Sequence, residues 1–296
     1  MTLTGLSAFP ITPCNSDGRV DAASLRRVLA PLLAAEVDSI GLLGSTGSYP
    51  YLAREERRRA LDIALDETAG GRPILVGIGA LRTDEAISLA QDAKAAGAAA
   101  GLLAPMSYTP LNGDEVFEHF SAVARDSGLP LCIYDNPSTT HFAFTAALIG
   151  RLARVPGVIA VKSPAPAAPT VAPHLEALRR AVPDGFSVGA SVDWHAAEAL
   201  LAGADAWYSV AGGVFPNVCR RLVRAAQGGD VGEARRIDGT LQPLWALFRE
   251  FSSLRVVYAA LAVLGTCRAE PPRPILPLPE PAQRRVADAL KLLDLS

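Results

Sequence analysis

Three groups of polar residues follow apolar runs, and the chemistry that they suggest begins with a lysine. Lys162 ends the apolar run Val158–Val161. Burying its ammonium group costs several kcal/mol unless the charge is paired or the proton is lost. A lysine whose pKa is lowered by burial is the usual nucleophile for a Schiff base with a carbonyl substrate. For this residue alone, a structural lysine in a salt bridge is an equal alternative.

Two further groups predict the rest of such a site. Tyr134 ends the apolar run before that of Lys162, where a phenol can shuttle protons, although a buried structural tyrosine is the commoner case. The turn Gly44–Ser48 offers hydroxyls and backbone N–H groups to a carboxylate, although a lone Gly/Ser turn is usually only a turn. Because adjacent strands lie ~4.8 Å apart, Tyr134 and Lys162 can both reach one small substrate. The three groups together suit a 2-oxo acid held as an imine.

The elements that must position these groups alternate along the chain. Short apolar runs, typical of parallel strands covered on both faces, are each followed by a segment with helical periodicity. The predicted strands are Leu6–Ile11, Ser39–Gly44, Ile74–Gly79, Ala99–Pro105, Pro130–Asp135, Val158–Ser163, Phe186–Ala190 and Ala206–Ala211. Eight such units predict an α/β fold of the TIM (β/α)8 barrel type, whose active site lies at the C-terminal ends of the strands. A doubly wound sheet is the alternative, but no G-x-G-x-x-G follows the first strand.

We place the catalytic barrel in residues 1–227 and a C-terminal helical region in residues 228–296. The predicted helices of the second region are Asp230–Glu250, Ser252–Leu264 and Pro281–Leu293, with a proline-rich connector before the last. Within the barrel, Thr83–Ala96 is a typical predicted helix, with Thr83 as its cap.

Composition excludes several classes of protein. Of the 296 residues, 50% are hydrophobic, which is enough for a large core, and the net charge of -2 with scattered basic residues argues against a nucleic-acid partner. No run approaches the ~18 apolar residues of a membrane span, and no targeting segment is evident, so we expect a soluble cytoplasmic protein. The four cysteines lie far apart and are expected to be free thiols, and no histidine or carboxylate spacing predicts a metal site.

Three motifs of the sequence resemble those of a known family. GSTGS at 44–48, YDNPSTT at 134–140 and VKS at 161–163 resemble, in order and spacing, the dihydrodipicolinate synthase and N-acetylneuraminate lyase family of class I Schiff-base lyases. The resemblance extends over almost the whole chain. It implies a TIM barrel and a homotetramer, or at least a homodimer, without metal or organic cofactor.

The resemblance also implies roles for individual residues. Lys162 would form the imine, with Tyr134 as the proton shuttle. Ser45 and Thr46 would hold the carboxylate of the 2-oxo acid, with Thr46 also in the proton relay. Gly189 and Tyr208 would line the pyruvate pocket.

Three departures from the family pattern bear on the substrate. Thr139 stands where dihydrodipicolinate synthases usually carry an arginine for the carboxylate of the second substrate. Ser48 and Ser163 replace acidic residues. The relay tyrosine that such enzymes contribute across a subunit interface falls at Ser107, with Tyr108 one residue later. Losing a charge-assisted arginine contact costs ~1.5–3 kcal/mol, which weakens the synthase interpretation.

We therefore predict a Schiff-base lyase, an aldolase or a dehydratase, that acts on pyruvate or a related 2-oxo acid of the sugar-acid type. One alternative is 4-hydroxy-tetrahydrodipicolinate synthase, which joins pyruvate to aspartate semialdehyde. Another is a catalytically silent homologue that binds small molecules. The expected partners are a small 2-oxo acid, an aldehyde and further copies of this chain.

Overall fold

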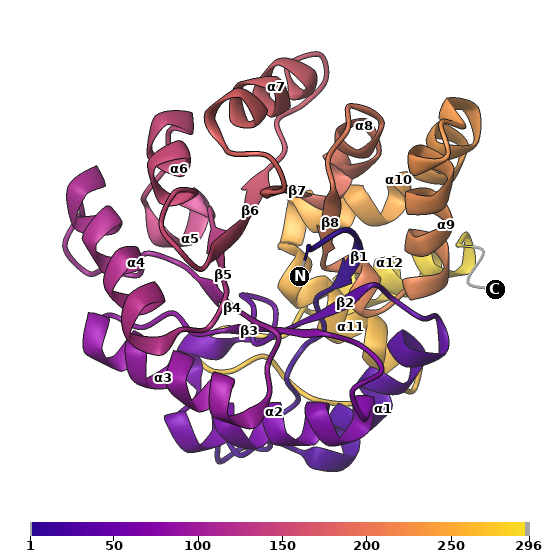
Figure 1. Cartoon of the computed structure of the whole chain (residues 1–296). Helices are drawn as coiled ribbons and strands as arrows, with labels where there is room; N and C mark the ends of the chain where they lie inside the picture. Colours follow the sequence, from indigo (N-terminus) through magenta and orange to yellow (C-terminus); the bar gives the residue numbers. More distant parts are fainter. Residues whose placement is uncertain (1, 294–296) are drawn as a thin grey trace.

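The computed structural model describes residues 2–293, which form a closed barrel of parallel strands arranged in sequence order (Figure 1). Each strand pairs in parallel with its neighbours, and β1 closes the barrel against β8. The strands are β1 (Gly5–Ala8), β2 (Ser39–Leu42), β3 (Ile74–Gly77), β4 (Ala100–Leu103), β5 (Leu131–Tyr134), β6 (Val158–Pro164), β7 (Ser187–Ser191) and β8 (Ala206–Ser209). The predicted TIM barrel with C-terminal helices is confirmed.

Most strands are shorter than predicted at their C-terminal ends. The first strand stops at Ala8 rather than Ile11, because Pro10 has no N–H to donate to a ladder. The fourth stops at Leu103, before Pro105. The residues just beyond both strand ends, such as Phe9 and Ala104, remain buried, so their apolar character continued the pattern past the end of the strand.

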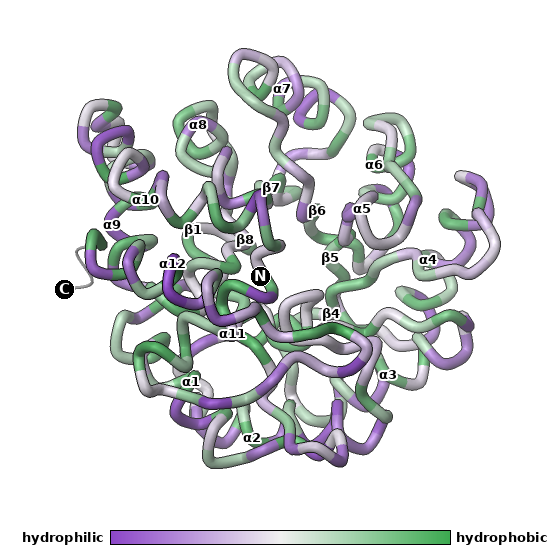
Figure 2. The backbone as a smooth tube through the Cα atoms, turned by 180° about the vertical axis from the view of Figure 1, so that it is seen from behind, coloured by the Kyte–Doolittle hydropathy of each residue, from purple (hydrophilic) through white to green (hydrophobic). Residues whose placement is uncertain are grey.

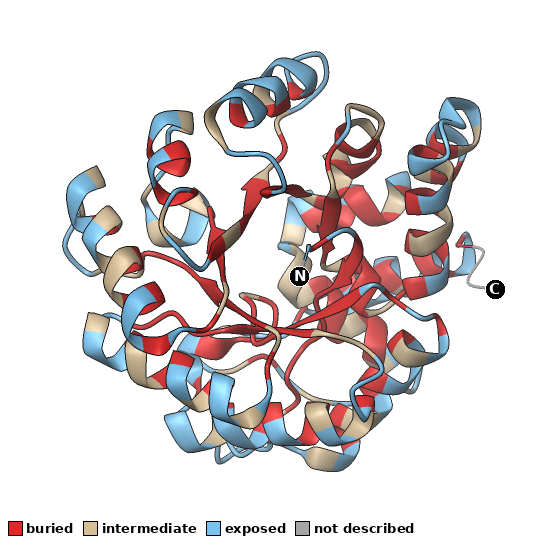
Figure 3. Ribbon diagram, viewed as in Figure 1, coloured by how far each residue is buried: buried red, intermediate tan, exposed pale blue. Residues whose placement is uncertain are grey.

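The helices form a ring around the barrel, and their outer faces are exposed while the strands are buried (Figure 3). The ring consists of α1 (Ala22–Ala34), α2 (Arg54–Thr68), α3 (Thr83–Ala96), α4 (Gly113–Ser127), α6 (Ala146–Leu152), α7 (Val171–Ala181), α8 (Ala196–Leu201) and α9 (Pro216–Gln227). Short helical turns follow four strands: η1 (Tyr49–Tyr51), α5 (Pro137–Thr140), η2 (Asp193–His195) and η3 (Ala211–Gly213).

The predicted cap of α3 is wrong. Arg82 occupies the N-cap position without a side-chain cap bond, and Thr83 is the first helical residue. The Thr83 hydroxyl instead lies 2.9 Å from Nδ1 of His119 on α4, so a tertiary contact takes the group that was expected to cap.

Side chains alternate across each strand, which decides what faces the barrel interior. On β6, Ala160 belongs to the interior cluster and Val161 to the layer between strands and helices. On β5, Cys132 and Tyr134 face inward while Ile133 faces the helices. The side-chain period of two therefore directs Lys162, two residues after Ala160, into the barrel.

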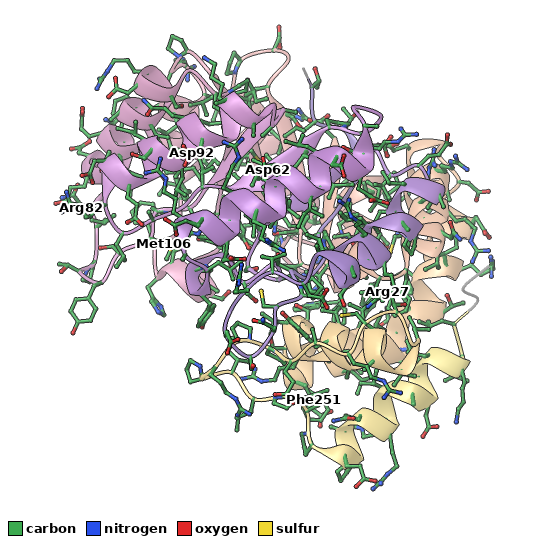
Figure 4. All side chains as sticks on the ribbon, turned by 90° about the horizontal axis from the view of Figure 1, so that it is seen from below. Arg27, Asp62, Arg82, Asp92, Met106 and Phe251 are labelled. Carbon is green, nitrogen blue, oxygen red and sulfur yellow. The ribbon has the colours of Figure 1, made fainter. Side chains whose placement is uncertain are left out.

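The C-terminal helices pack against one side of the barrel. They are α10 (Val231–Phe251), α11 (Ser253–Val263) and α12 (Glu280–Lys291), and they contact α8, α9 and one another. Figure 4 shows the C-terminal helices beside the barrel, with Phe251 labelled among them and Asp62 and Asp92 on α2 and α3 of the ring. Hydrophobic segments gather at the strands while hydrophilic ones lie outside (Figure 2).

The predicted domain division and the prediction of no membrane span can be compared with the helices of the structure. The division of the chain after residue 227 falls between α9 and α10 and stays a prediction. Within the described part of the chain, no helix is both long and apolar enough to cross a membrane.

Candidate active site

A cavity of about 580 Å³ opens at the C-terminal ends of the strands, and most of the predicted site residues line it. Its wall combines residues after β2, β5, β7 and β8 with residues of the C-terminal helices. Among its lining residues are Ser45, Thr46, Tyr134, Asn136, Thr139, Lys162, Asp193, Tyr208, Ser252, Ser253, Arg255 and Ile275. The volume lies in the range of small-molecule sites.

Lys162 lies at the buried end of this cavity, with 4% of its surface exposed. Its Nζ lies 4.3 Å from the ring centroid of Phe9 and 4.3 Å from that of Tyr134. The two rings offer their negative faces to a cation and surround the amine with apolar carbon on those sides. None of the described residues forms a salt bridge with Lys162, so the structure does not support the alternative of a salt-bridged structural lysine.

Tyr134 and Lys162 are brought together by strand register. The two residues are direct partners in the pairing of β5 with β6, so their side chains leave the sheet side by side. The Tyr134 hydroxyl lies 2.9 Å from Oγ of Ser45 and accepts a hydrogen bond from Nδ2 of Asn136 at 3.0 Å. A phenol held between a hydroxyl and an amide beside an amine is well placed to move protons.

The turn after β2 presents Ser45 and Thr46 to the cavity. Leu43 adopts a left-handed conformation with φ of 54°, and a Cβ on Gly47 would lie 2.8 Å from Leu43 Cα, so the tight turn requires glycine there. The residue of this turn that shares a hydrogen bond with the Tyr134 hydroxyl is Ser45, not Thr46. Thr46 is a buried residue that lines the cavity, and its hydroxyl has no hydrogen-bond partner among the described residues.

Asp193 is a charged residue of the cavity that sequence reasoning missed. Its carboxylate accepts hydrogen bonds from Trp207 Nε1 at 2.9 Å and from the backbone N–H groups of Ala211 at 2.8 Å and Val210 at 3.3 Å. Burial raises the pKa of Asp193 to about 6, while these hydrogen bonds and the charge of Lys162 act against that rise. The signal in the sequence was an acid three residues beyond the predicted strand end at Ala190.

Gly189 and Tyr208 act as a pair. Gly189 lies beside Lys162 in the pairing of β6 with β7, and a Cβ at this position would lie 2.3 Å from Cε2 of Tyr208. The Tyr208 ring lines the cavity, and its hydroxyl accepts a hydrogen bond from Sγ of Cys132 at 3.6 Å. Gly189 does not itself line the cavity; it leaves the space that the Tyr208 ring fills.

The remaining predicted residues lie at the edge of the cavity or outside it. Thr139 lines the cavity at an exposed position, and its hydroxyl donates to the backbone oxygen of Asn136 at 3.2 Å. Ser107 donates to the backbone oxygen of Thr109, and the Tyr108 side chain is 97% exposed. Neither lines the cavity of its own chain, so a relay hydroxyl that reaches another subunit stays a prediction.

The rim of the cavity was not predicted. Phe248, Ser252, Ser253 and Arg255 reach it from the junction of α10 and α11, and Ile275 reaches it from the proline-rich connector. These segments gave only helical and proline patterns in the sequence, and such patterns carry no sign of where a helix will dock.

Among residues 2–293, no group of three or more His, Cys, Asp or Glu side chains is arranged to hold a metal ion. All four cysteines are free. The expected independence from cofactors stays a prediction.

Comparison with known proteins gives consistent matches over the whole chain. Residues 2–293 match the Dihydrodipicolinate synthetase family. The chain is 32% identical over 290 residues to a 4-hydroxy-tetrahydrodipicolinate synthase of Neisseria meningitidis serogroup B, covering 98% of both chains.

Solved structures agree. A dihydrodipicolinate synthase from Agrobacterium tumefaciens is 54% identical, with a TM-score of 0.96 and 98% of both chains covered. A prophage protein of the same family from E. coli K12, solved in complex with pyruvate, is 28% identical, with a TM-score of 0.90 and 99% of both chains covered. The protein therefore belongs to the dihydrodipicolinate synthetase family and is an enzyme, a lyase of the class I aldolase type.

Proposed function

We propose that the protein is a Schiff-base-forming lyase that acts on pyruvate or a related 2-oxo acid, with Lys162 as the imine-forming residue. The observation that carries this proposal is the direct pairing of Tyr134 with Lys162 on β5 and β6, at the closed end of the cavity. The pairing puts an amine and a phenol on adjacent strands, which hold their relative positions more rigidly than loops do, and this supports the roles of nucleophile and proton shuttle.

In the proposed mechanism the Lys162 amine attacks the C2 carbonyl of the substrate. Tyr134 delivers protons to the oxygen, which leaves as water, and the protonated imine remains. Ser45 and Thr46 hold the substrate carboxylate through hydroxyl and backbone N–H groups. In C–C cleavage the iminium accepts the electron pair of the C3–C4 bond while Tyr134 takes the proton of the C4 hydroxyl, which releases an aldehyde and leaves an enamine that is then protonated at C3. In dehydration a C3 proton is removed, and the C4 hydroxyl gains a proton and leaves as water. Hydrolysis returns the free amine.

The relatives support the choice of substrate. Pyruvate is bound in the E. coli family member, and the curated relatives are named as synthases of 4-hydroxy-tetrahydrodipicolinate. We propose that this protein also uses pyruvate or a 2-oxo acid that contains the pyruvate unit, without a metal or organic cofactor.

The test is reduction with borohydride in the presence of pyruvate, followed by intact mass and peptide mapping. Because the chain has three lysines, Lys94, Lys162 and Lys291, the map assigns the adduct directly. An adduct on Lys162 alone supports the mechanism. If pyruvate and the larger hydroxy-2-oxo acids all leave Lys162 unmodified in the folded protein, the proposed mechanism is wrong. The result would then favour a catalytically silent homologue that binds small molecules.

The synthase reaction with aspartate semialdehyde is the second candidate, and the names of the relatives favour it. Thr139, bonded to its own turn, offers no cation to the second substrate. Steady-state assays with pyruvate and aspartate semialdehyde, for wild type and for Thr139→Arg, distinguish the candidates. Synthase turnover by the wild-type enzyme comparable with that on other substrates would establish the second candidate.

We also propose that the enzyme works as a homotetramer or homodimer. The exposed side chains of Leu81 and Tyr108, at 64% and 97%, favour association through the loops after β3 and β4. Sedimentation of Tyr108→Ser against wild type tests this.

A further inference from the structure

The cavity carries few charges, and they are distributed unevenly. Its charged lining residues are Lys162, Asp193 and Arg255. Lys162 is packed between two rings, and Asp193 is held by three N–H donors. Arg255, in the first turn of α11, is half-buried and forms no hydrogen bond or ion pair with any residue that the structure describes. A partly desolvated cation thus faces the cavity without an anion.

Other arginines of the C-terminal helices do have partners. Arg285 of α12 reaches Glu250 of α10 through two bonds of 2.6 and 2.7 Å. Arg235 of α10 forms a similar two-bond pair with Glu198 of α8. Such pairs use the guanidinium fork as it binds carboxylates generally. The guanidinium of Arg255 has the same fork, but its side chain lines the cavity that the substrate would enter.

The size of the cavity indicates a substrate that extends from Lys162 toward Arg255. A three-carbon 2-oxo acid on Lys162 fills only a small part of about 580 Å³. Its carboxylate is accounted for by the turn with Ser45 and Thr46, at the buried end. The remaining space reaches the half-exposed rim, where Arg255 stands with the hydroxyls of Ser252 and Ser253.

We propose that Arg255 binds a second carboxylate at the distal end of the substrate, so that the enzyme selects 2-oxo diacids over 2-oxo acids with a neutral end. This inference rests on the proposed function, since the first end of the substrate is held as an imine on Lys162. Asp193 does not compete for Arg255, because its oxygens are bound to Trp207, Val210 and Ala211. Arg255 is here a specificity-determining residue, and it takes no part in bond breaking.

The test compares substrates that differ only in the distal charge. Imines of 2-oxoglutarate and 2-oxoadipate, and of their ω-amides, are trapped on Lys162 with borohydride, and the concentration for half-maximal trapping is measured by mass. Pyruvate serves as the probe without a distal group. The variants are Arg255→Met, Arg255→Lys and, as a matched control, Arg249→Met, whose exposed side chain does not line the cavity.

Wild type should trap at least one diacid at about 10-fold lower concentration than its amide, because a charge-assisted contact at a half-exposed site is worth about that factor. Arg255→Met should abolish this preference without changing pyruvate trapping, Arg255→Lys should retain part of it, and Arg249→Met should behave as wild type.

Three results would overturn the inference, and they differ in what they imply for the proposed function. Equal trapping of acid and amide at both chain lengths, or a preference that survives in Arg255→Met, with pyruvate trapped normally, removes the role of Arg255 and leaves the proposed function intact. Absence of trapping with every compound, pyruvate included, removes the imine mechanism and this inference with it.

Discussion

At the floor of the cavity each ionisable group is fixed by its neighbours, whereas at the rim Arg255 has no partner. The floor is formed by strand ends: Lys162 lies between the rings of Phe9 and Tyr134, and Asp193 accepts three hydrogen bonds. The rim is formed by a helix junction, where Ser253 and Arg255 are half-buried and Ser252 is exposed.

This difference assigns different tasks to the two regions. Strand register holds the floor, so the groups that form and break bonds keep their geometry without substrate. At the rim, the guanidinium of Arg255 has no partner among the described residues, so it is available to bind an anionic group of a ligand. Substitutions at the floor should therefore remove chemistry, and substitutions at the rim should change which substrate is used.

The largest effect is expected at Lys162. Lys162→Ala removes the nucleophile, so turnover should fall by about 10⁴-fold or more, and borohydride should trap no substrate. Steady-state kinetics and intact mass measure both, and circular dichroism reports the fold. Lys94→Ala, at an exposed position of α3, is the control and should behave as wild type. Turnover near that of wild type in Lys162→Ala would show that Lys162 is not the nucleophile and that the floor of the cavity does not carry the chemistry.

Tyr134→Phe separates proton transfer from covalent chemistry. It removes the hydroxyl that contacts Ser45 and Asn136 but keeps the ring beside Lys162. We expect kcat to fall by about 10²-fold or more. The adduct on Lys162 should still form, more slowly, in borohydride trapping. An unchanged kcat would make the phenol a packing residue.

Asp193 gives a prediction about pH. Its pKa in the folded protein is about 6, above the ordinary value of 3.8, so the native state holds a proton that the unfolded chain has lost between these values. This stabilising contribution is present at low pH and is lost as pH rises from about 4 to 6. The unfolding free energy of wild type should thus fall by about 2–3 kcal/mol relative to Asp193→Asn between pH 4 and 7. Urea titrations at several pH values measure it, and a constant difference would contradict it.

The smallest effect is expected at Gly189, which supports the floor without lining it. Gly189→Ala places a methyl group against the fully buried Tyr208 ring, and overpacking of this kind costs about 1–3 kcal/mol. Thermal unfolding measures the loss, and Gly185→Ala is not a suitable control because Gly185 has a φ of 81°. The better control is Gly239→Ala in α10, where no atom lies near the added Cβ. Equal stability of the two variants would show that Tyr208 moves freely.

The floor was predictable from the sequence, and the rim was not. Lys162, Tyr134 and the turn at Ser45 each follow a continuous apolar run, and parallel strands bring the ends of such runs to one edge. The position of Asp193 in the cavity was not predicted, because it depends on the left-handed conformation of Val192, with φ of 72°. No sequence pattern indicates that conformation for a branched residue. Arg255 escaped because its contacts depend on how α10 and α11 dock, which is a tertiary property. Thr83 failed as a cap for the same reason, since its partner His119 lies on another helix.

The junction between α10 and α11 is a single residue, Ser252, and this limits the changes in length that the rim tolerates. With so short a link, the rotational phase of α11 follows that of α10. A helix advances 100° per residue, so one residue inserted into or deleted from the end of α10 would turn Arg255 away from the cavity. The connector from Gly265 to Pro279 contains no helix or strand and follows Arg255 in the chain, so a change in its length does not alter the phase of α11 relative to α10. The position of the guanidinium is thus set by the length of α10 as much as by the identity of residue 255.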